Sequence, residues 1–433
     1  MKKIGVGILG CGVIGSAVVK NLILGAEDIS RRCGLEVEIK KIAELDFGRK
    51  KGVPESAGPL FTKDLNEIIA SKEIDIVVEL MGGLDFAFET IIKAIKAGKH
   101  IVTANKHLIA KKGEKIYEEA QKAGVEFCFE ASVAGAVPII RTLKEGIVAG
   151  KIHSVLGIIN GTANYILTKM TESNANFADV LAEAQRLGYA EKDPTFDIEG
   201  IDAAHKIAIM ASLSFGTPVD FDSILVEGIS RLNSDDFDYA KKFDKVIKLL
   251  GIARMDNGKI DVRVHPAMLD CGEPLAKVNG VTNAVELKVS HADELMLIGP
   301  GAGGDATSSA VIADIVEIAR NINSGSVGRV APAAFIQSAR KNLPMKPIEE
   351  IECCYYLRFY VEDRPGVLAS MAKILGDNNI SISTAYQKDV HGDTVPLMIT
   401  THTALEKNIR AAVEKIDKLE TTKDKTVIIR LEE

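Results

Sequence analysis

Several features that mark specialised classes of protein are missing from this sequence. No apolar run reaches the roughly 20 residues that a helix needs to span a bilayer, so no membrane partner is expected. The six cysteines form no CxxC pair and show no Cys/His ligand spacing, which predicts reduced thiols in a cytoplasmic protein. Basic residues are not in excess, because 53 Lys and Arg face 60 Asp and Glu. The net charge of −7 argues against a nucleic-acid or anionic-membrane partner.

What the sequence does contain is ordinary for a globular protein. Hydrophobic residues make up 46% of the chain and charged residues 26%. A length of 433 residues is enough for two or three domains, each with its own core.

The first 130 residues alternate between two periodicities. Runs rich in Val and Ile, expected to be strands, occupy residues 3–9, 36–44, 74–80, 100–104 and 125–131. The stretches between these runs have helical periodicity. Strands of near-continuous apolar character belong to sheets that helices cover on both faces, so this segment predicts an α/β domain with a parallel sheet.

The remainder of the chain indicates two further domains. Four helices are expected at residues 162–171, 176–187, 201–215 and 239–250. Strands are expected at 260–269, 283–290 and 294–299, which gives an α+β domain. A glycine-rich loop then opens a long helix within 299–322, and the segment 342–352, with two prolines, is a candidate linker. The tail from residue 355 has the order βαββαβ of a ferredoxin-like sheet.

A glycine motif separates the first expected strand from the first expected helix. In GILGCGVIGSAV, Gly10, Gly12 and Gly15 form the GxGxxG pattern of dinucleotide-binding turns. Gly10 permits the tight turn, Gly12 lets the backbone approach a pyrophosphate, and Gly15 allows the helix to pack closely on the strand. The N–H groups at the helix start, around Val13 and Ile14, are expected to hold the phosphates. A glycine-rich turn without a ligand is the alternative.

The end of the second strand leaves the choice of dinucleotide open. Glu44 or Asp46 would accept a hydrogen bond from the ribose 2′-hydroxyl of NAD. Arg49 and Lys50, a few residues later, would instead bind the 2′-phosphate of NADP. Both chemistries are present, so the two cofactors remain alternatives.

Two lysines occupy positions suited to proton transfer. Lys106 follows Thr103 at the carboxyl end of a strand, the edge where ligands bind in an open α/β sheet, although a solvated lysine opening a helix is the alternative. Lys206 lies one helical turn after Asp202 on a largely apolar helix. This pair is either a surface ion pair or a charged face turned toward a pocket.

Two other segments combine polar groups with small residues. Glu130 opens the run EASVAGAVPII, whose accessible carbonyls suit a hard cation, although an ordinary domain crossover is the simpler interpretation. Gly161 and Thr162 follow Asn160 where a strand becomes a helix. The N–H groups of such a helix start suit a substrate carboxylate, and an ordinary N-cap is the alternative.

These segments resemble a known family when they are taken together. The run AQRLGYAEKDPTFDIEGIDAAHK at 184–206 is similar to the signature of homoserine dehydrogenase. So are VTANKHLIA, FEASVAGAVPII, IINGTANYILTKM and GPGAGGDATSSAVIADI, in the same order. EDRPGVLA and NNISI in the tail resemble an ACT domain. The resemblance implies a Rossmann domain at 1–135, completed by helices from about 303–342, a catalytic and dimerisation domain at 136–302, and an ACT domain at 353–433.

Members of this family interconvert L-homoserine and L-aspartate 4-semialdehyde with NAD(P) in threonine, methionine and isoleucine biosynthesis. Carried onto this sequence, the resemblance implies Lys206 as general acid/base, Lys106 as a second candidate, and Asp202 as the group that orients the substrate beside it. Glu191 is implied to accept from the substrate amino group. The other implied residues of this pocket are Gly161, Thr162, Tyr189 and Asp197.

The resemblance also implies sites for the cofactor and for a cation. Besides the glycine motif, the implied cofactor contacts are Thr103, Lys106, Gly301, Arg49 and Lys50. A structural sodium ion is implied, held by Glu130 and the carbonyls of Val133, Gly135 and Val137.

The ACT-like tail implies regulation by an amino acid. Such domains pair side by side and bind amino acids between the partners. Here that implies Gly366 and Val367, next to Arg364 and Pro365, and also Asn379. Threonine is the expected effector, and a homodimer or homotetramer is the expected assembly. A purely structural dimerisation module is the alternative.

Two competing functions can be weighed on particular residues. An aspartate-semialdehyde dehydrogenase would need a catalytic cysteine in the second domain, but Cys271, the one cysteine between 129 and 352, has no obvious histidine partner. A non-catalytic amino-acid sensor would not need Lys206, Glu191 and Asp202, yet all three are present.

Overall fold

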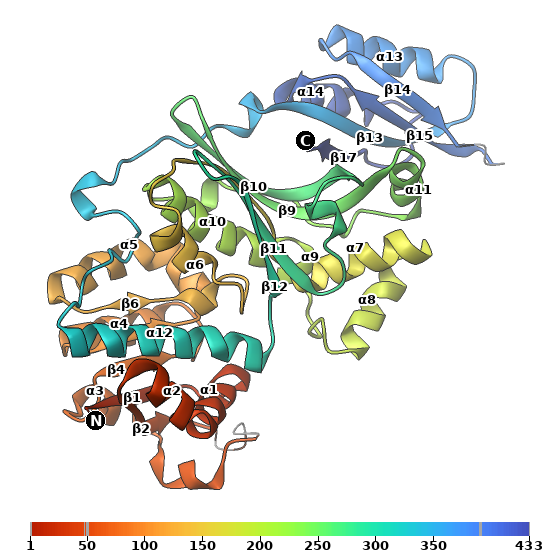
Figure 1. The fold of residues 1–433 in the computed structure, drawn as a ribbon. Coiled ribbons are helices and arrows are strands. Elements are labelled where there is room, and N and C mark those ends of the chain that lie inside the picture. Colours follow the sequence, from red (N-terminus) through yellow and green to blue (C-terminus); the bar gives the residue numbers. More distant parts are fainter. Residues whose placement is uncertain (1, 47, 49–51, 389–391, 433) are drawn as a thin grey trace. The chain divides into compact units, whose positions relative to one another are not determined.

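The structure is a computed structural model that describes residues 2–46, 48, 52–388 and 392–432 (Figure 1). The chain divides into two compact units. Unit 1 comprises Met1–Ile159, His205–Asp222 and Asn283–Leu343, and unit 2 comprises Asn160–Ala204, Ser223–Thr282 and Pro344–Glu433. Each unit is therefore built from separate stretches of the chain.

Unit 1 contains a six-stranded parallel sheet in the order β3-β2-β1-β4-β5-β6. Its strands are β1 (Lys3–Leu9), β2 (Glu36–Ala43), β3 (Phe61–Thr62), β4 (Ile76–Glu79), β5 (His100–Thr103) and β6 (Phe127–Cys128). This order is typical of dinucleotide-binding sheets, in which ligands bind beyond the carboxyl ends of the strands where the order reverses. Here that point lies between β1 and β4, and the predicted α/β class is confirmed.

Helices complete unit 1. They are α1 (Val13–Leu24), α2 (Ala26–Cys33), α3 (Asn66–Ala70), α4 (Asp85–Lys96), α5 (Lys106–Ala123), α6 (Ile139–Arg141) and α12 (Gly304–Ser324). Helix α12 packs on α1 and on the sheet, and its Val311 and Ile315 are fully buried in the core. The unit also holds β7 (Ile152–Ile158), which pairs antiparallel with β11 (Thr282–Val289), and β12 (Asp293–Pro300).

The expectation of several helices between 303 and 342 is wrong beyond the first of them. Helix α12 ends at Gly325, whose positive φ of 68° gives a left-handed cap. Gly328, at φ 80°, and Pro332 then keep the chain from resuming a helix. Among the described residues after this cap, only a short 3₁₀ turn at Gln337–Ala339 follows before the unit ends.

Unit 2 begins with helical segments and continues with long strands. They are α7 (Gly161–Ser173), α8 (Phe177–Arg186), α9 (Thr195–Ile198), β8 (Leu225–Val226), α11 (Ser234–Lys242), β9 (Lys245–Asp256) and β10 (Lys259–Asp270). Helix α10 (Ile201–Phe215) has the predicted bounds, and its first turn belongs to this unit.

The helix expected at 239–250 is wrong. Helix α11 ends at Lys242, and residues 245–256 form β9, which pairs antiparallel with β10 along its whole length. The stretch from Ile247 to Ala253, apolar except for Lys248, is buried on both faces, a pattern that does not distinguish a buried helix from a buried strand. The neighbouring strand β10 decided between the two.

The tail of the chain has the predicted βαββαβ order. Its elements are β13 (Glu352–Glu362), α13 (Val367–Asp377), β14 (Ile382–Gln387), β15 (Thr394–Thr401), β16 (Ala404–Leu405), α14 (Glu406–Ile416) and β17 (Val427–Leu431). The sheet continues through β10-β17-β13-β15-β14, because β17 pairs parallel with β10 as well as antiparallel with β13. The expected linker also pairs with this sheet, since the amide of Ile260 donates to the carbonyl of Pro344. The tail is therefore joined to β10 through backbone hydrogen bonds.

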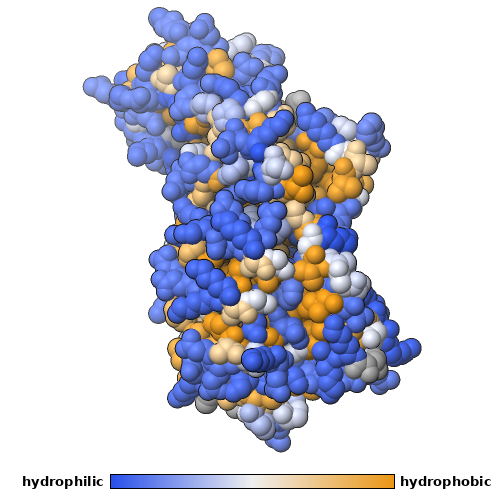
Figure 2. All heavy atoms as spheres, turned by 90° about the vertical axis from the view of Figure 1, so that its left-hand side faces the viewer, coloured by the Kyte–Doolittle hydropathy of each residue, from blue (hydrophilic) through white to orange (hydrophobic). Residues whose placement is uncertain are grey.

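The surface carries apolar residues in separate patches. The face in Figure 2 is largely hydrophilic, with several apolar areas between the polar ones. Val13 and Leu45 are among the most exposed large apolar side chains, at 80% and 78%. Of the helices described, none combines the length and the apolar character that crossing a bilayer demands.

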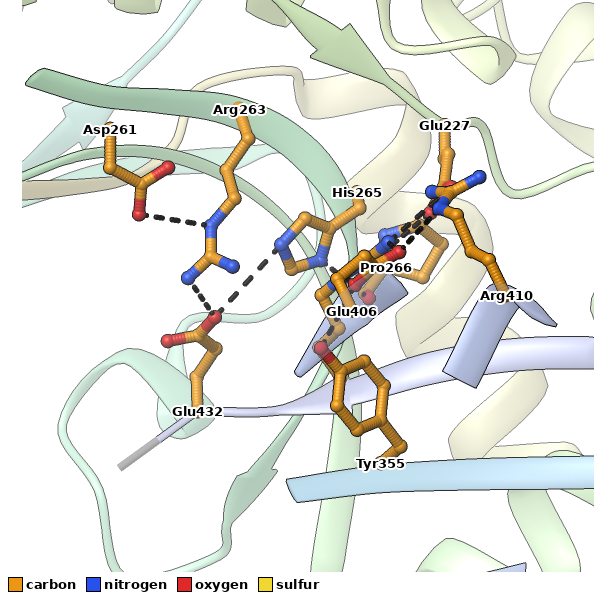
Figure 3. A network of polar contacts seen from close by, with 10 residues as sticks. Glu227, Asp261, Arg263, His265, Pro266, Tyr355, Glu406, Arg410 and Glu432 are labelled. Atoms are coloured by element: carbon orange, nitrogen blue, oxygen red, sulfur yellow. Dashed lines mark hydrogen bonds and ion pairs between the residues drawn. The ribbon is translucent and has the colours of Figure 1, made fainter. Parts of the chain in front are cut away.

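A buried network of charges joins β10, β17 and α14 (Figure 3). Arg263 on β10 donates to Glu432 over 2.8 Å and lies 3.4 Å from Asp261. Arg430 on β17 donates from Nε and Nη2 to the two oxygens of Glu406, at 2.9 and 2.5 Å. The Arg430 and Glu406 side chains are both fully buried. Each charge in such a buried pair needs its partner, because removing one partner leaves an uncompensated buried charge that destabilises the fold.

His265 lies inside this network and is fully buried. Its Nδ1 is 2.9 Å from the carbonyl oxygen of Pro266, so Nδ1 carries a proton and donates it. Its Nε2 is 3.9 Å from a carboxylate oxygen of Glu432. Burial, reinforced by the charges of Arg430 and Arg263, lowers the pKa of His265 well below its ordinary value. The ring is therefore neutral in the folded protein.

The pH dependence of unfolding is expected to report this neutral histidine. Below the ordinary pKa of 6.5 the unfolded chain takes up a proton that the folded chain does not. Stability therefore falls as the pH decreases from about 7 to about 5. An H265N variant, which keeps an N–H donor but does not titrate, is expected to lose less stability over that range. Urea midpoints at several pH values measure the two slopes, and equal slopes would contradict a neutral His265.

Candidate active site

The glycine motif forms a turn that fits a dinucleotide. Gly10 has φ 94°, and a Cβ there would lie 2.8 Å from the carbonyl oxygen of Leu80 at the end of β4. A Cβ on Gly15 would lie 2.2 Å from the carbonyl oxygen of Gly10, so the helix start packs directly on the turn. A Cβ on Gly12, in contrast, meets no described atom within 4 Å. Gly12 thus borders open space, as a close approach to a pyrophosphate requires.

The carboxylate of Glu44 is held at this turn. It follows β2 and accepts hydrogen bonds from the backbone amides of Cys11 (2.7 Å) and Asp46 (3.0 Å). One acidic group at the end of the second strand is the arrangement that accepts a ribose hydroxyl. Arg49 and Lys50, the residues expected to bind a 2′-phosphate, lie outside the described residues.

The second glycine-rich loop reaches the same helix start. A Cβ on Gly304, the first residue of α12, would lie 3.3 Å from the carbonyl oxygen of Val13. A Cβ on Gly301 would overlap the side chain of Asn283, so this position excludes any larger residue. The structure thus places the start of α12 against the start of α1, with Gly301 three residues before it.

A buried carboxylate that the sequence did not single out organises the ends of β4 and β5. Glu79 is fully buried, and burial raises its pKa. It accepts from the hydroxyl of Thr103 (2.7 Å) and from the amide of Met81 (2.8 Å). The Thr103 hydroxyl in turn accepts from the amide of Asn105, whose side chain caps α5. This hydrogen-bond network fixes the start of α5, whose first residue is Lys106. The Thr103 hydroxyl is bonded within the network, to Glu79 and to the amide of Asn105.

Glu130 lies in a tight, buried turn. Its carboxylate accepts from the amides of Ile140 (2.9 Å) and Arg141 (2.8 Å), and burial raises its pKa. Ala134 and Gly135 follow with φ of 51° and 54°, both in the left-handed region. Val133 and Val137 are buried on either side of this turn. The four residues expected at the cation site therefore belong to one compact loop.

Lys206 is a buried cationic residue of unit 1. Its side chain is 8% exposed, and its Nζ donates to the carbonyl oxygen of Ile159 over 2.7 Å. Ile159 directly precedes Asn160 in the sequence. The neighbouring His205 packs between the rings of His107 (4.8 Å) and Phe221 (4.5 Å), as expected for a packing histidine.

In unit 2 an amide and two carboxylates meet at the start of α7. Asn160 caps this helix by accepting from the amide of Ala163 (2.7 Å). Its Nδ2 donates to Asp197 (2.7 Å) and to Asp202 (2.9 Å). Asp197 and Asp202 come from α9 and the first turn of α10, so this cluster joins three elements. The two acids place negative charge beside a helix N-terminus that favours it.

Gly161 and Thr162, also expected in the pocket, form the first turn of the same helix α7. The Thr162 hydroxyl donates to the carbonyl oxygen of Tyr189 over 2.6 Å. A Cβ on Gly161 would lie 2.8 Å from the carbonyl oxygen of Val281, so only glycine fits there. Glu191 follows Tyr189 in an exposed loop, where its carbonyl oxygen accepts from a glutamine side chain.

The residues expected to bind an effector are divided between the two ends of α13. Gly366 and Val367 line a hollow of about 380 Å³ together with Arg364 and Pro365. Asn379, with φ 57°, lies just beyond the other end of the same helix.

Known proteins support the combination of these features. The family model of homoserine dehydrogenase matches residues 138–316, that of its NAD-binding domain matches 10–130, and that of the ACT domain matches 355–421. Homoserine dehydrogenase of Neisseria gonorrhoeae is 45% identical over 433 residues, which is 100% of this chain and 99% of that protein.

Solved structures agree with this result. The crystal structure of a homoserine dehydrogenase from Thiobacillus denitrificans has a TM-score of 0.93 at 45% identity, and the match covers 100% of this chain and 99% of that one. A hyperthermophilic archaeal homoserine dehydrogenase in complex with NADPH has a TM-score of 0.62 at 28% identity and covers 73% of this chain and 98% of its own. These matches give no support to the two competing functions. The chain belongs to the homoserine dehydrogenase family of NAD(P)-dependent oxidoreductases and carries a C-terminal ACT domain.

Proposed function

We propose that this chain interconverts L-homoserine and L-aspartate 4-semialdehyde and that Lys206 moves the proton. The observation that carries the proposal is the burial of the Lys206 ammonium, bonded to the carbonyl next to Asn160. A lysine amine held in a fixed position can serve as a general acid/base. In the oxidation direction, neutral Lys206 accepts the proton of the substrate hydroxyl, and in the reduction it returns that proton to the carbonyl oxygen.

The substrate carries an ammonium and a carboxylate, and each needs a partner of the opposite charge or polarity. The substrate ammonium is assigned to Glu191, Asp197 and Asp202. The substrate carboxylate is assigned to the N–H groups of Gly161 and Thr162, because a helix N-terminus binds anions. Tyr189, 44% exposed, is tied to this helix start through its carbonyl oxygen, which accepts from the Thr162 hydroxyl. Lys106, at the N-terminal end of α5, is the second candidate for proton transfer.

The glycine turn fits the nicotinamide dinucleotide, since Gly12 borders open space at the start of α1. When bound, the nicotinamide supplies or accepts the hydride. Glu44 favours NAD at the ribose, whereas Arg49 and Lys50 would favour NADP. Thr103 is assigned a cofactor contact through its backbone, because its hydroxyl is bonded within the protein.

Initial rates of L-homoserine oxidation with NAD⁺ and with NADP⁺ test the proposal. Turnover with either cofactor is the expected result, and the ratio of the two kcat/KM values decides which cofactor is preferred. Absence of turnover with both, from protein that is folded by circular dichroism, would overturn the proposal.

The glycine turn gives a clean mutational test. Gly12→Ala is expected to raise KM for the dinucleotide at least about tenfold, or ~1.4 kcal/mol, while the melting temperature stays unchanged. The added methyl meets no described protein atom, so any loss reflects the ligand. Gly58→Ala in the same unit, where a Cβ also meets nothing described within 4 Å, is the matched control and should behave as wild type. A Gly12→Ala enzyme with normal KM would show that the dinucleotide binds elsewhere.

A sodium ion is proposed at the Glu130 loop. Each Glu130 oxygen accepts one amide and keeps a further lone pair, and the carbonyls of Val133, Gly135 and Val137 are the neutral donors. Hard cations prefer oxygen ligands of this kind.

Sodium is expected to stabilise the protein. A concentration ten times the dissociation constant adds about 1.4 kcal/mol to the free energy of unfolding. The melting temperature should therefore be higher in sodium chloride than in choline chloride at equal ionic strength. Glu130→Gln should remove this difference between the salts. Equal melting temperatures of the wild type in both salts would contradict a sodium site.

The ACT domain is proposed to make the enzyme responsive to an amino acid. Threonine is the proposed effector, the hollow at Gly366 and Val367 the proposed site together with Asn379, and a homodimer or homotetramer the proposed assembly. The enzyme would then act in threonine, methionine and isoleucine biosynthesis. Its activity as a function of threonine concentration tests the regulatory part.

A further inference from the structure

The turn between Asp197 and Asp202, the two acids proposed to bind the substrate, packs against one short segment of unit 2. This segment, residues 226–229, begins with the last residue of β8 and is here named the seat. A Cβ on Gly228 would lie 2.4 Å from the carbonyl oxygen of Ile198, and the amide of Ile229 donates to that same oxygen over 2.8 Å. On the other side, Gly200 has φ 79°, and a Cβ there would lie 3.3 Å from the side chain of Val226.

These contacts restrict movement of the turn at residues 198–200 relative to the seat. Residues 198–200 lie between Asp197 and Asp202, the two acids that accept from the Asn160 side chain. The close backbone approach at Gly228 is possible only for glycine and holds this turn against the seat. Gly200 adds a left-handed φ and lies close to the side chains of Val264 and Val226. A shift of the seat is therefore expected to shift both acids relative to Asn160.

The seat is in turn held by charges of the ACT domain (Figure 3). Glu227 accepts from Arg430 Nη1 on β17 over 2.6 Å and from Arg410 Nη2 on α14 over 2.9 Å. Burial by itself raises the pKa of Glu227, but the guanidinium groups of Arg430 and Arg410 outweigh it and keep that pKa below its ordinary value. Both arginines also donate to Glu406, which belongs to α14. Glu227 thus connects the seat to three charged residues of the ACT domain, Arg410, Arg430 and Glu406.

A hollow of about 350 Å³ borders Glu199, Glu227, Gly228 and Arg410, so part of the space between the seat and α14 is open. Charge-assisted hydrogen bonds have narrow geometric requirements, and two of them converge on one carboxylate here.

We propose that Glu227 is a positioning residue for the reaction, held by Arg410 and Arg430, which fixes the seat and thereby the placement of Asp197 and Asp202 at the substrate. The inference rests on the proposed role of these two acids. It assigns to the ACT domain a part in building the substrate site even when no effector is bound. The arrangement of α14 and β17 then sets the affinity for the substrate.

The expected signature is a selective change in KM. Asp197 and Asp202 hold the substrate, so loosening them should raise KM for L-homoserine more than it lowers kcat. The dinucleotide turn belongs to unit 1, so KM for the cofactor should not change. A general loss of stability would instead lower the active fraction and reduce kcat alone.

Two variants test the proposal at different risk of misfolding. Arg410 is 41% exposed, and Arg410→Gln leaves the buried pair of Arg430 and Glu406 in place, so this variant is expected to fold. KM for L-homoserine should rise about 3- to 10-fold, and Arg410→Lys should restore part of it. Glu227→Gln should raise KM by a larger factor. Lys418→Gln is the matched control, because it removes an exposed ion pair near the end of the same helix that does not touch the seat.

The outcomes separate this proposal from the proposed function. If wild type does not turn over L-homoserine, the proposed function fails and the positioning role fails with it. If wild type is active and folded Arg410→Gln keeps both its KM values, the positioning role of Glu227 is overturned while the enzyme assignment stands. That role is likewise overturned if Lys418→Gln raises KM as much as Arg410→Gln. Should Glu227→Gln not fold, Arg410→Gln decides alone.

Discussion

Replacement of Lys206 by alanine is expected to lower kcat for L-homoserine oxidation by roughly 10²- to 10⁴-fold, the usual contribution of a positioned acid/base. Lys206 is buried, and its Nζ is held 2.7 Å from the carbonyl oxygen of Ile159. This contact fixes the position of the amine. Steady-state kinetics of the oxidation, with KM measured for both substrates, give the effect directly.

Three comparisons make this result specific. Lys206→Met keeps most of the side-chain volume, so a similar loss in Met and Ala variants attributes it to the amine rather than to a cavity. Lys169→Ala removes a surface lysine from α7 and should leave kcat unchanged. If Lys206→Ala retains most of the rate and Lys106→Ala does not, proton transfer belongs to Lys106.

Replacement of Arg430 by methionine is expected to cost about 3–5 kcal/mol of unfolding free energy, the typical effect of removing one partner from a buried ion pair. Arg430 and Glu406 are both fully buried, so Glu406 would keep only Arg410 and the Tyr355 hydroxyl as partners. Glu227 would lose its 2.6 Å contact as well. Urea denaturation of wild type and variant measures the loss.

A surface arginine provides the contrast. Arg31 is 76% exposed and pairs with Asp28 within α2, so Arg31→Met should cost less than about 1 kcal/mol. The double variant Arg430→Met with Glu406→Gln should recover part of the stability, because it no longer buries an uncompensated carboxylate. A loss of less than about 1 kcal/mol in Arg430→Met would mean that the network is hydrated and contributes little.

Local pattern predicts much of this fold. The strand β1 and the helix α10 have the expected bounds, and both are largely apolar runs buried along almost their whole length. The error at β9 is of another kind. Residues 247–253 are buried on both faces, Lys248 included, and only the pairing of β9 with β10 makes them a strand. The helical region ends at Gly325 because single glycine and proline residues stop it. The long periodic stretch before them gives no sign of this end.

Some residues of the candidate site could likewise be predicted from the sequence, and others could not. Gly10, Gly12 and Gly15 form one local turn, so their spacing identifies them. Glu79 and Glu227 have no such pattern, since Thr103, a partner of Glu79, is 24 residues distant and Arg430, a partner of Glu227, is 203 residues distant. Glu79 did lie in a polar strand end of the expected kind, which is the one local signal for it. Nothing near Glu227 in the sequence indicates two arginines.

The packing of α12 on α1 has a consequence for how this protein is made. Lys20 and Asp305, which meet between the two helices, are 285 residues apart in the chain. A contact of such separation closes slowly during folding. A nascent chain on the ribosome therefore exposes the glycine turn long before α12 exists to support it. A dinucleotide that binds only the finished turn stabilises the state in which α12 has packed on α1. We therefore expect the supply of cofactor in the cell to set the yield of folded enzyme as well as the rate of the reaction.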